Sequence, residues 1–378
     1  MNRLIDAIYF LLIASLFVNV PIYEGETGNT LNLYHALIAL SCVATVRLGG
    51  RMRLSIDVMF LSAMCLTSVL GWAVYGMTTR ALLLPMVLMA FTSGHHWFLR
   101  TTANQRRRTY HRVAWVVLAS ILVRNAVYHD HLGAIYTRSA SDYDLFYLSS
   151  GGQNLEATHL GVLSVLLVGG PWFLPMLSIA WATSLLLLSR AGMLACLAAM
   201  GCWVVGGRLS GAKLVVSASL IAIAILAIGL EVTGVVEIAM LDRFDMSTEA
   251  TLAADDEGRL AIWRSGWEVM TANGFGHGVG NGFGRLNDNI GSHLKENNSH
   301  NILVEYGLDG GWLCCGLFIG LLGSVLWRRD ALSVPSHRFV LTYGLLGLCQ
   351  FTGYDAIGWF FIGVSHAERH KIGISIRE

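Results

Sequence analysis

The chain has 378 residues, of which 54% are hydrophobic and only 13% are charged. Its apolar residues gather in repeated runs long enough to cross a bilayer as helices, which takes about 20 residues. This composition excludes an ordinary soluble globular protein and predicts a polytopic membrane protein whose first partner is membrane lipid. The net charge of +1 gives no indication of nucleic acid as a partner.

Twelve apolar runs predict an all-α fold of about 12 transmembrane helices. The first run follows Arg3 and lacks a small-residue cleavage site, so we expect it to be retained as a span. In chain order, the predicted spans are 4–20, 31–47, 54–75, 80–98, 112–128, 157–169, 172–188, 191–206, 214–231, 301–327, 338–353 and 356–366.

Lysine and arginine residues in short loops favour the cytoplasm. With the N-terminus inside, the predicted cytoplasmic loops and tails hold 17 of the 26 basic residues, and this bias predicts that both termini are cytoplasmic. These residues are Arg3, Arg47, Arg51, Arg53, Arg100, Arg106, Arg107, Arg108, Arg112, Arg208, Lys213, Arg328, Arg329, Arg338, Arg369, Lys371 and Arg377.

The same topology places two long polar segments, 129–156 and 232–300, on the outer side. The second is rich in Asp, Glu, Gly and Asn, so we expect the chemistry to face outward. The predicted organisation is therefore N-terminal helices with the first outer loop (1–156), middle helices with Arg190 (157–231), a large outer catalytic loop (232–300) and C-terminal helices (301–378).

The outer catalytic loop carries two recognisable pieces. "DDEGRLAIWRSGWEVM" starts with acidic residues and predicts an amphipathic helix that lies on the membrane or on other spans, with apolar residues at Leu260, Trp263, Trp267 and Met270. It is followed by "NGFGHGVGNGFG", residues 273–284, whose alternating glycines, including Gly278 and Gly280, predict a tight loop of bare backbone.

"SHNILVEYGLDGG", residues 299–311, places His300, Asn301 and Glu305 at the mouth of an apolar run. If a helix begins near Ser299, His300 lies in its first turn, and Asn301 and Glu305 share one face. A helix N-terminus has unpaired N–H groups and a partial positive charge, which disfavour imidazolium and attract anions. A neutral histidine can then accept a proton from a hydroxyl nucleophile beside a phosphate.

Each of these residues has a simpler reading as well. His300 alone reads as an interfacial histidine that caps a helix, but Glu305 counts against this, because a carboxylate near a span is costly unless it is paired or functional. Arg190, in "LLLLSRAGMLACLAA", interrupts an apolar run either by reaching to the membrane interface or by clamping an anion there.

Three further arginines are candidates for anion binding. Arg259 follows the acidic residues 255–257, so a surface ion pair is its alternative reading. Arg264 lies five residues on, about 140° around an ideal helix, so at most one of the two is expected to lead. Arg124, near another outer span end, is the weaker candidate, because nothing nearby in the sequence supports it.

No metal or cofactor is predicted. The seven cysteines all lie in apolar runs, which argues against disulfides and against cysteine metal sites. His277 and the pairs His95–His96 and His129–His131 lack a third ligand at metal-site spacing. "GHGVGNG" also lacks the strand that precedes a dinucleotide-binding turn.

Three pieces in this order resemble the O-antigen ligase and polymerase family of bacterial envelope enzymes. They are "SRAG" at 189–192, "GRLAIW" to "GHGVGNGFG" at 258–284, and "SHNILVEYGLDGG" at 299–311. The resemblance covers roughly 155–312. The chain departs from the usual pattern in the residue order after Arg190, and in Gly276 and His277, where the family commonly has a proline-containing segment.

The resemblance implies a metal-independent, inverting glycosyltransferase in the bacterial inner membrane. Its donor would be a glycan on undecaprenyl pyrophosphate, and its acceptor a hydroxyl of the lipid A core or of another glycan, at the periplasmic face. Carried over onto this chain, Arg190 and Arg259, with Arg264 as a further candidate, would bind the diphosphate, and His300 would activate the hydroxyl. Asn301 and Glu305 would orient the helix start, while Gly278 and Gly280 would let sugars approach the backbone.

Other readings remain open at this point. A lipid-linked glycan transporter also suits twelve spans with charges near the membrane, but the sequence shows no matching pair of broken spans in two halves. A receptor or scaffold would not need the predicted site residues to converge. Ligase, polymerase and glycan-to-protein transferase share the motifs, and the chain shows no long C-terminal soluble extension of the protein-glycosylating type.

Overall fold

The protein is mostly helical, as predicted. The structure, a computed structural model, describes residues 2–24, 30–46, 54–132, 148, 152–187, 189–206, 259–290, 299–328, 331–349 and 353–375. Helices lie in eleven of the twelve ranges predicted as spans, and the remaining range, 214–231, lies outside the described residues. The same is true of 232–258, the first part of the predicted outer catalytic loop.

The helices follow the apolar runs of the sequence. In chain order they are α1 (Asn2–Phe17), α2 (Leu33–Val46), α3 (Ile56–Tyr75), the 3-10 helix η1 (Thr79–Leu82), α4 (Leu83–Arg100), α5 (Ala103–Val127), η2 (His129–His131), α8 (Gly152–Leu167), α9 (Phe173–Leu186), α10 (Arg190–Val205), α13 (Arg259–Ala272), α14 (Gly282–Ile290), α15 (Ile302–Leu326), α16 (Pro335–Gly347) and α17 (Ala356–Ser375).

Three of the described helical segments are long and apolar enough to cross a membrane: Ile56–Tyr75, Thr79–Arg100 and Ile302–Leu326. Shorter apolar helices occupy Leu33–Ala44, Asn154–Leu167, Phe173–Leu186 and Arg190–Val205. The number of twelve spans therefore stays a prediction.

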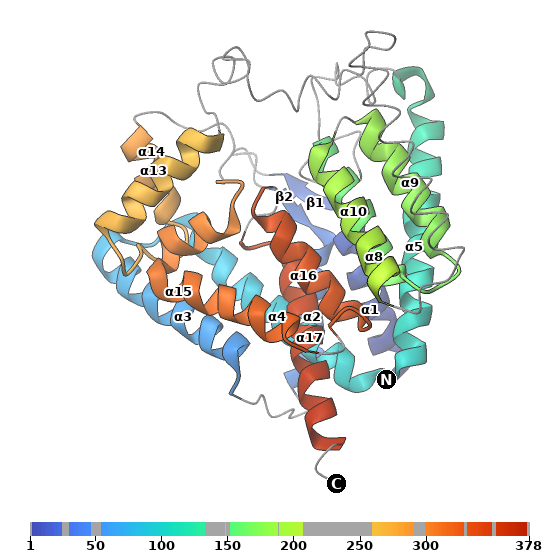
Figure 1. Cartoon of the computed structure of the whole chain (residues 1–378), viewed down its shortest axis with the longest axis horizontal. Coiled ribbons are helices and arrows are strands. Elements are labelled where there is room, and N and C mark those ends of the chain that lie inside the picture. The colour runs from blue at the N-terminus through green and yellow to red at the C-terminus, as the bar shows by residue number, and fades with distance from the viewer. Residues whose placement is uncertain are drawn as a thin grey trace.

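A short β-hairpin between α1 and α2 was not expected from the apolar runs. Strands β1 (Pro21–Glu24) and β2 (Thr30–Asn32) pair antiparallel, with Tyr23 opposite Leu31. Pro21 is the first residue of β1, a position where the missing N–H of proline is tolerated. The hairpin lies at the end of α1 and α2 (Figure 1).

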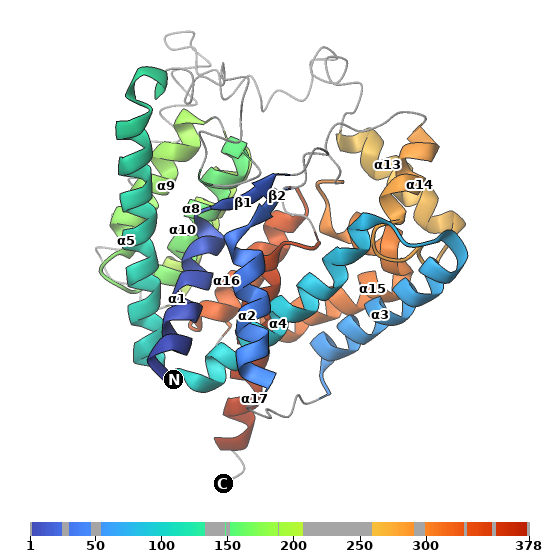
Figure 2. The same ribbon diagram turned by 180° about the vertical axis from the view of Figure 1, so that it is seen from behind.

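The helices pack into one body with a continuous apolar core. In Figures 1 and 2, α3 runs along α15, α17 crosses α4, and α8 packs against α9 and α10. Aromatic rings fill the centre, where Phe60 of α3 stacks on Trp359 of α17 with centroids 5.3 Å apart, and Tyr306 of α15 meets Phe318 at 4.9 Å. The labelled N- and C-terminal ends lie at the same end of the molecule (Figure 1).

The predicted amphipathic helix is α13. It packs on α15 and α14, and contact with other helices was one of the two arrangements that the sequence left open. Met270 is buried, whereas Trp267 is half exposed, with its ring edge against Trp312 at 4.8 Å. Gly266 permits the close approach, because a Cβ there would lie 2.5 Å from a Val304 methyl group of α15.

Candidate active site

His300 lies in the turn that precedes α15. It adopts a φ of +51°, in the left-handed region that asparagine, aspartate and histidine tolerate better than most residues. The hydroxyl of the fully buried Ser299 donates to the Asn301 carbonyl at 2.9 Å and closes the turn. Our expectation that His300 occupies the first turn of the helix was wrong by two residues, because the helix begins at Ile302.

Asn301 is the N-cap residue that sets this start. Its side-chain oxygen accepts hydrogen bonds from the backbone N–H groups of Leu303 at 3.0 Å and Val304 at 3.2 Å. Asparagine is among the residues that cap helix N-termini best. The sequence had led us to expect that the N–H groups of this helix start would bind an anion. These two N–H groups are instead bonded to Asn301 within the protein.

Helix α13 holds the histidine turn from the side. The indole N–H of Trp263 donates to the Ser299 carbonyl oxygen at 2.9 Å, one residue before His300. One turn earlier on the same helix, the Arg259 guanidinium donates to the Cys349 carbonyl oxygen at 2.7 Å. Cys349 follows the end of α16, so α13 contacts both the start of α15 and the end of α16.

Arg264 makes a different contact from Arg259. Its side chain is 85% exposed, and its Nε lies 3.5 Å from a carboxylate oxygen of Glu268, one turn further along α13. This divergence agrees with the angle expected from their five-residue spacing. Of the two residues, Arg259 is the one that reaches α16.

Arg190 is the first residue of α10 and is exposed. Ser189 caps this helix by accepting a hydrogen bond from the Gly192 N–H at 3.1 Å. Gly192 allows α10 to approach α8, because a Cβ there would lie 2.7 Å from the Ala157 methyl group. The "SRAG" motif thus builds a capped helix start that carries Arg190 on its first turn.

The end of α16 is where the predicted residues come together. The guanidinium groups of Arg259 and Arg190 both lie within electrostatic range of the Cys349 thiol. Gly347, the last residue of α16, packs against Ile302, since a Cβ there would lie 3.0 Å from an Ile302 methyl group. His300 lies two residues before Ile302. The structure therefore gathers Arg190, Arg259 and the histidine turn around one helix end.

Glu305 ties this region to the connection between α16 and α17. Its side chain is buried, and Oε2 accepts the Gly353 N–H at 2.5 Å. The Gly353 carbonyl accepts the Trp359 indole N–H at 2.8 Å and the Tyr306 hydroxyl. The Glu305 carboxylate is therefore hydrogen-bonded through Oε2, whereas Oε1 is buried without a hydrogen-bond partner among the described residues.

The glycine loop packs inside the protein. Gly278 and Gly280 are buried and have φ values of +84° and +93°, which favour glycine. The Gly278 N–H donates to the Asp309 carbonyl at 2.8 Å, and the Val279 carbonyl accepts the Trp72 indole N–H at 2.9 Å. The close backbone approach that we expected for sugars is made here to α3 and α15.

Asp309 is a site-supporting residue that the sequence reasoning missed. Its carboxylate accepts the Gly282 N–H at 2.9 Å, the Gly280 N–H at 3.3 Å and the Tyr354 hydroxyl at 2.5 Å. Burial raises the pKa of Tyr354 well above its usual value, so this phenol remains a protonated donor. The signal that could have revealed Asp309 is a carboxylate followed by Gly310 and Gly311 inside an apolar run. At Gly311, where φ is +69°, helix α15 kinks.

Two other residues considered from the sequence have internal partners. Arg124 and Glu156 form an ion pair at 2.7 Å with side chains only 6% and 1% exposed, so this arginine joins α5 to α8. A ring nitrogen of His277 lies 3.0 Å from the Leu308 carbonyl oxygen, and its ring lies 5.3 Å from that of Tyr75.

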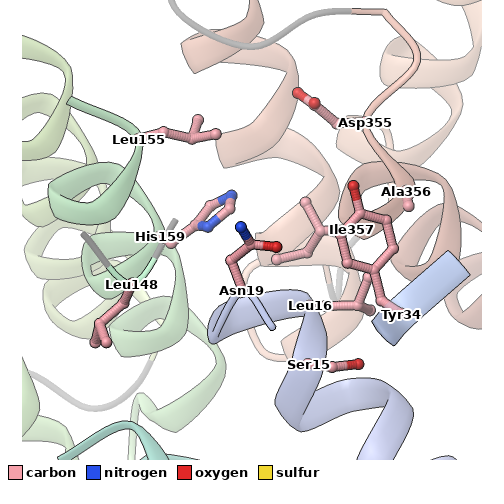
Figure 3. Close-up of a pocket in the computed structure, with 10 residues that line it drawn as sticks. All are labelled: Ser15, Leu16, Asn19, Tyr34, Leu148, Leu155, His159, Asp355, Ala356 and Ile357. Atoms are coloured by element: carbon pink, nitrogen blue, oxygen red, sulfur yellow. The ribbon is translucent and has the colours of Figure 1, made fainter. Parts of the chain in front are cut away.

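A small polar cavity lies beside the Glu305 region. Figure 3 shows Asn19, Tyr34, His159 and Asp355 gathered around it from different elements. Its volume of about 40 Å³ is enough to hold ordered water. Asp355 is within electrostatic range of Glu305, which places the cavity next to the candidate site.

Residues 175–319 match the family model described as O-antigen ligase. The chain carries an O-antigen ligase family domain. This O-antigen ligase domain runs from α9 into α15 and includes Arg190, Arg259, the glycine loop and His300. The match confirms the family resemblance and indicates a glycosyltransferase-like membrane enzyme that acts on lipid-linked glycans. A search of curated proteins finds no match to the chain.

Proposed function

We propose that the protein transfers a glycan from undecaprenyl pyrophosphate to a sugar hydroxyl at the periplasmic face of the bacterial inner membrane. The observation that carries the proposal is that Arg190, Arg259 and the His300 turn, which all belong to the O-antigen ligase domain, meet at the end of α16. The acceptor is the lipid A core in a ligase and another glycan in a polymerase of the same family.

Arg190 and Arg259 bind the diphosphate of the donor in this proposal. They are the first described residues of α10 and α13, and their guanidinium groups both lie within electrostatic range of the Cys349 thiol, just after α16. A guanidinium group is permanently charged and offers two parallel N–H groups to phosphate oxygens, so it binds the diphosphate without a metal ion. The same contacts stabilise the charge that the lipid diphosphate gains as it leaves.

His300 acts as the general base. Its imidazole takes the proton from the acceptor hydroxyl as the oxygen attacks the anomeric carbon. A new carbon–oxygen bond forms, the bond from the anomeric carbon to the diphosphate oxygen breaks, and the lipid diphosphate departs with the electron pair. Attack from the face opposite the leaving group inverts the anomeric centre.

The supporting residues fix the position of this base. Asn301 caps α15 and thereby sets where the histidine turn ends. Glu305 holds the connection to α17 through Gly353, and Gly278 and Gly280 pack the glycine loop against α15. A base held by several independent contacts stays close to the reactive geometry, which is a large part of catalysis by positioning.

The test is glycan transfer by the purified protein from a lipid-diphosphate-linked oligosaccharide. Lipid A core and a second lipid-linked glycan are offered as acceptors, in buffer with a chelator. Transfer to the first identifies a ligase, transfer to the second identifies a polymerase, and neither should be affected by the chelator. If the protein binds the donor but transfers to neither acceptor, a transporter replaces this proposal.

A further inference from the structure

Another cavity, lined by charged residues, lies at the opposite end of α16 from the candidate active site. It opens between the start of α5, the end of α8 and the start of α16, and its volume is about 260 Å³. Arg106, Arg107 and Arg338 line it, together with His111. Helix α5 runs along one side of the molecule away from this end (Figure 2). The charge bias of the loops predicts that this end faces the cytoplasm.

Arg338 is the most informative of these residues. It is only 4% exposed, and its hydrogen bond to the Val168 carbonyl oxygen is long, at 3.4 Å. Its Nε is buried without a hydrogen-bond partner, and within the described part of the chain no carboxylate pairs with it. A buried charge without a counter-ion is costly, and an anion in the cavity would offset this cost.

The rest of the lining is also biased toward positive charge. Arg107 is exposed, whereas Arg106 is held in place, because it donates to the Thr101 carbonyl at 2.6 Å and lies over the Phe98 ring at 4.0 Å. Glu368 is the carboxylate that lines the cavity, and it accepts the Ser336 hydroxyl at 2.5 Å. The start of α16 adds the partial positive charge of a helix N-terminus.

We propose that this cavity binds a phosphate group carried by an anionic ligand. Guanidinium groups match phosphate oxygens with paired N–H donors, and three of them surround a space large enough for a head group. Leu166 and Leu167 border the same cavity, which gives it an apolar side next to its charged side. An anionic phospholipid meets both sides, while a soluble phosphate meets only the charged side.

The test uses the full-length protein, purified and stripped of lipid in an uncharged detergent. Thermal unfolding is followed while phosphatidylglycerol, phosphatidylcholine or inorganic phosphate is titrated. Arg107→Gln removes an exposed lining charge, and Arg338→Gln removes the buried one. Arg108→Gln is the matched control, since Arg108 is equally exposed on the same helix and is not among the lining residues.

We expect phosphatidylglycerol to raise the unfolding temperature of the wild type, and Arg107→Gln to weaken this binding about tenfold. Arg108→Gln should stay within about twofold of the wild type. A shift with phosphatidylglycerol alone identifies the lipid source, and a shift with inorganic phosphate alone identifies a soluble source. No shift with either, or an equal loss in Arg107→Gln and Arg108→Gln, overturns the proposal.

Discussion

The indole N–H of Trp263 donates to the backbone carbonyl oxygen of Ser299 at 2.9 Å, across 36 positions of the chain. This bond fixes the turn that presents His300. Because Arg259 reaches Cys349 from the same helix, α13 sets the positions of the proposed base and of one proposed diphosphate ligand together. The geometry of the proposed site therefore depends on how α13 packs against α15.

Replacing Trp263 with phenylalanine removes the hydrogen bond to Ser299 and keeps an aromatic ring. We expect kcat to fall about fivefold with little change in the donor KM, because one hydrogen bond that positions the base contributes about 1 kcal/mol. Steady-state transfer kinetics measure both constants. Trp267→Phe is the control, since that ring is 57% exposed, and it should remain within about twofold of the wild type.

Arg259→Lys keeps the charge and removes the paired N–H donors. We expect the donor KM to rise at least about tenfold, nearly as much as in Arg259→Ala, because lysine binds phosphate as a point charge. Arg264→Lys, on the exposed side of α13, should change the KM by no more than about twofold. An equal rise in the donor KM of Arg259→Lys and Arg264→Lys would show that Arg259 does not make the specific phosphate contact.

Gly280→Ala tests the packing of the glycine loop. The backbone there has a φ of +93°, and the added Cβ would lie 2.6 Å from the Thr78 hydroxyl and 3.0 Å from the Ala81 nitrogen. We expect the free energy of unfolding to fall by about 1–3 kcal/mol. Thermal unfolding in detergent measures this, with Gly284→Ala as the control, because a Cβ at Gly284 meets open space.

Asp309→Asn replaces a carboxylate that accepts three hydrogen bonds with an amide whose NH₂ group cannot accept any. We expect a loss of about 2–3 kcal/mol in the free energy of unfolding, since buried donors are left unsatisfied. Asp288→Asn on α14 is a suitable comparison, because that carboxylate is 72% exposed. Equal stability of the two variants would show that Asp309 does not hold the glycine loop.

Most helix positions could be predicted because long apolar runs determine them locally. The start of α15 was expected near Ser299, three residues before its observed start at Ile302, since a local pattern does not reveal which polar residue of "NNSHN" will cap the helix. The hairpin of β1 and β2 was missed because its strands are only four and three residues long and lie next to two strong apolar runs.

The site residues were predictable one by one, but their supports were not. His300, Arg190 and Arg259 stand out as polar residues next to apolar runs. The bonds from Arg259 to Cys349 and from Tyr354 to Asp309 join positions 90 and 45 residues apart. Periodicity and spacing describe neighbours along one helix, so contacts between distant helices require the packed structure.

The most direct test of the account is the transfer rate of His300→Asn. Asparagine accepts the left-handed backbone found at this position, so the variant removes the base and keeps the turn. Glycan transfer and donor binding are measured on the same purified sample. We predict a loss of at least about a hundredfold in transfer rate with donor binding retained. A variant that transfers within about tenfold of the wild type would contradict the assignment of His300 as the general base.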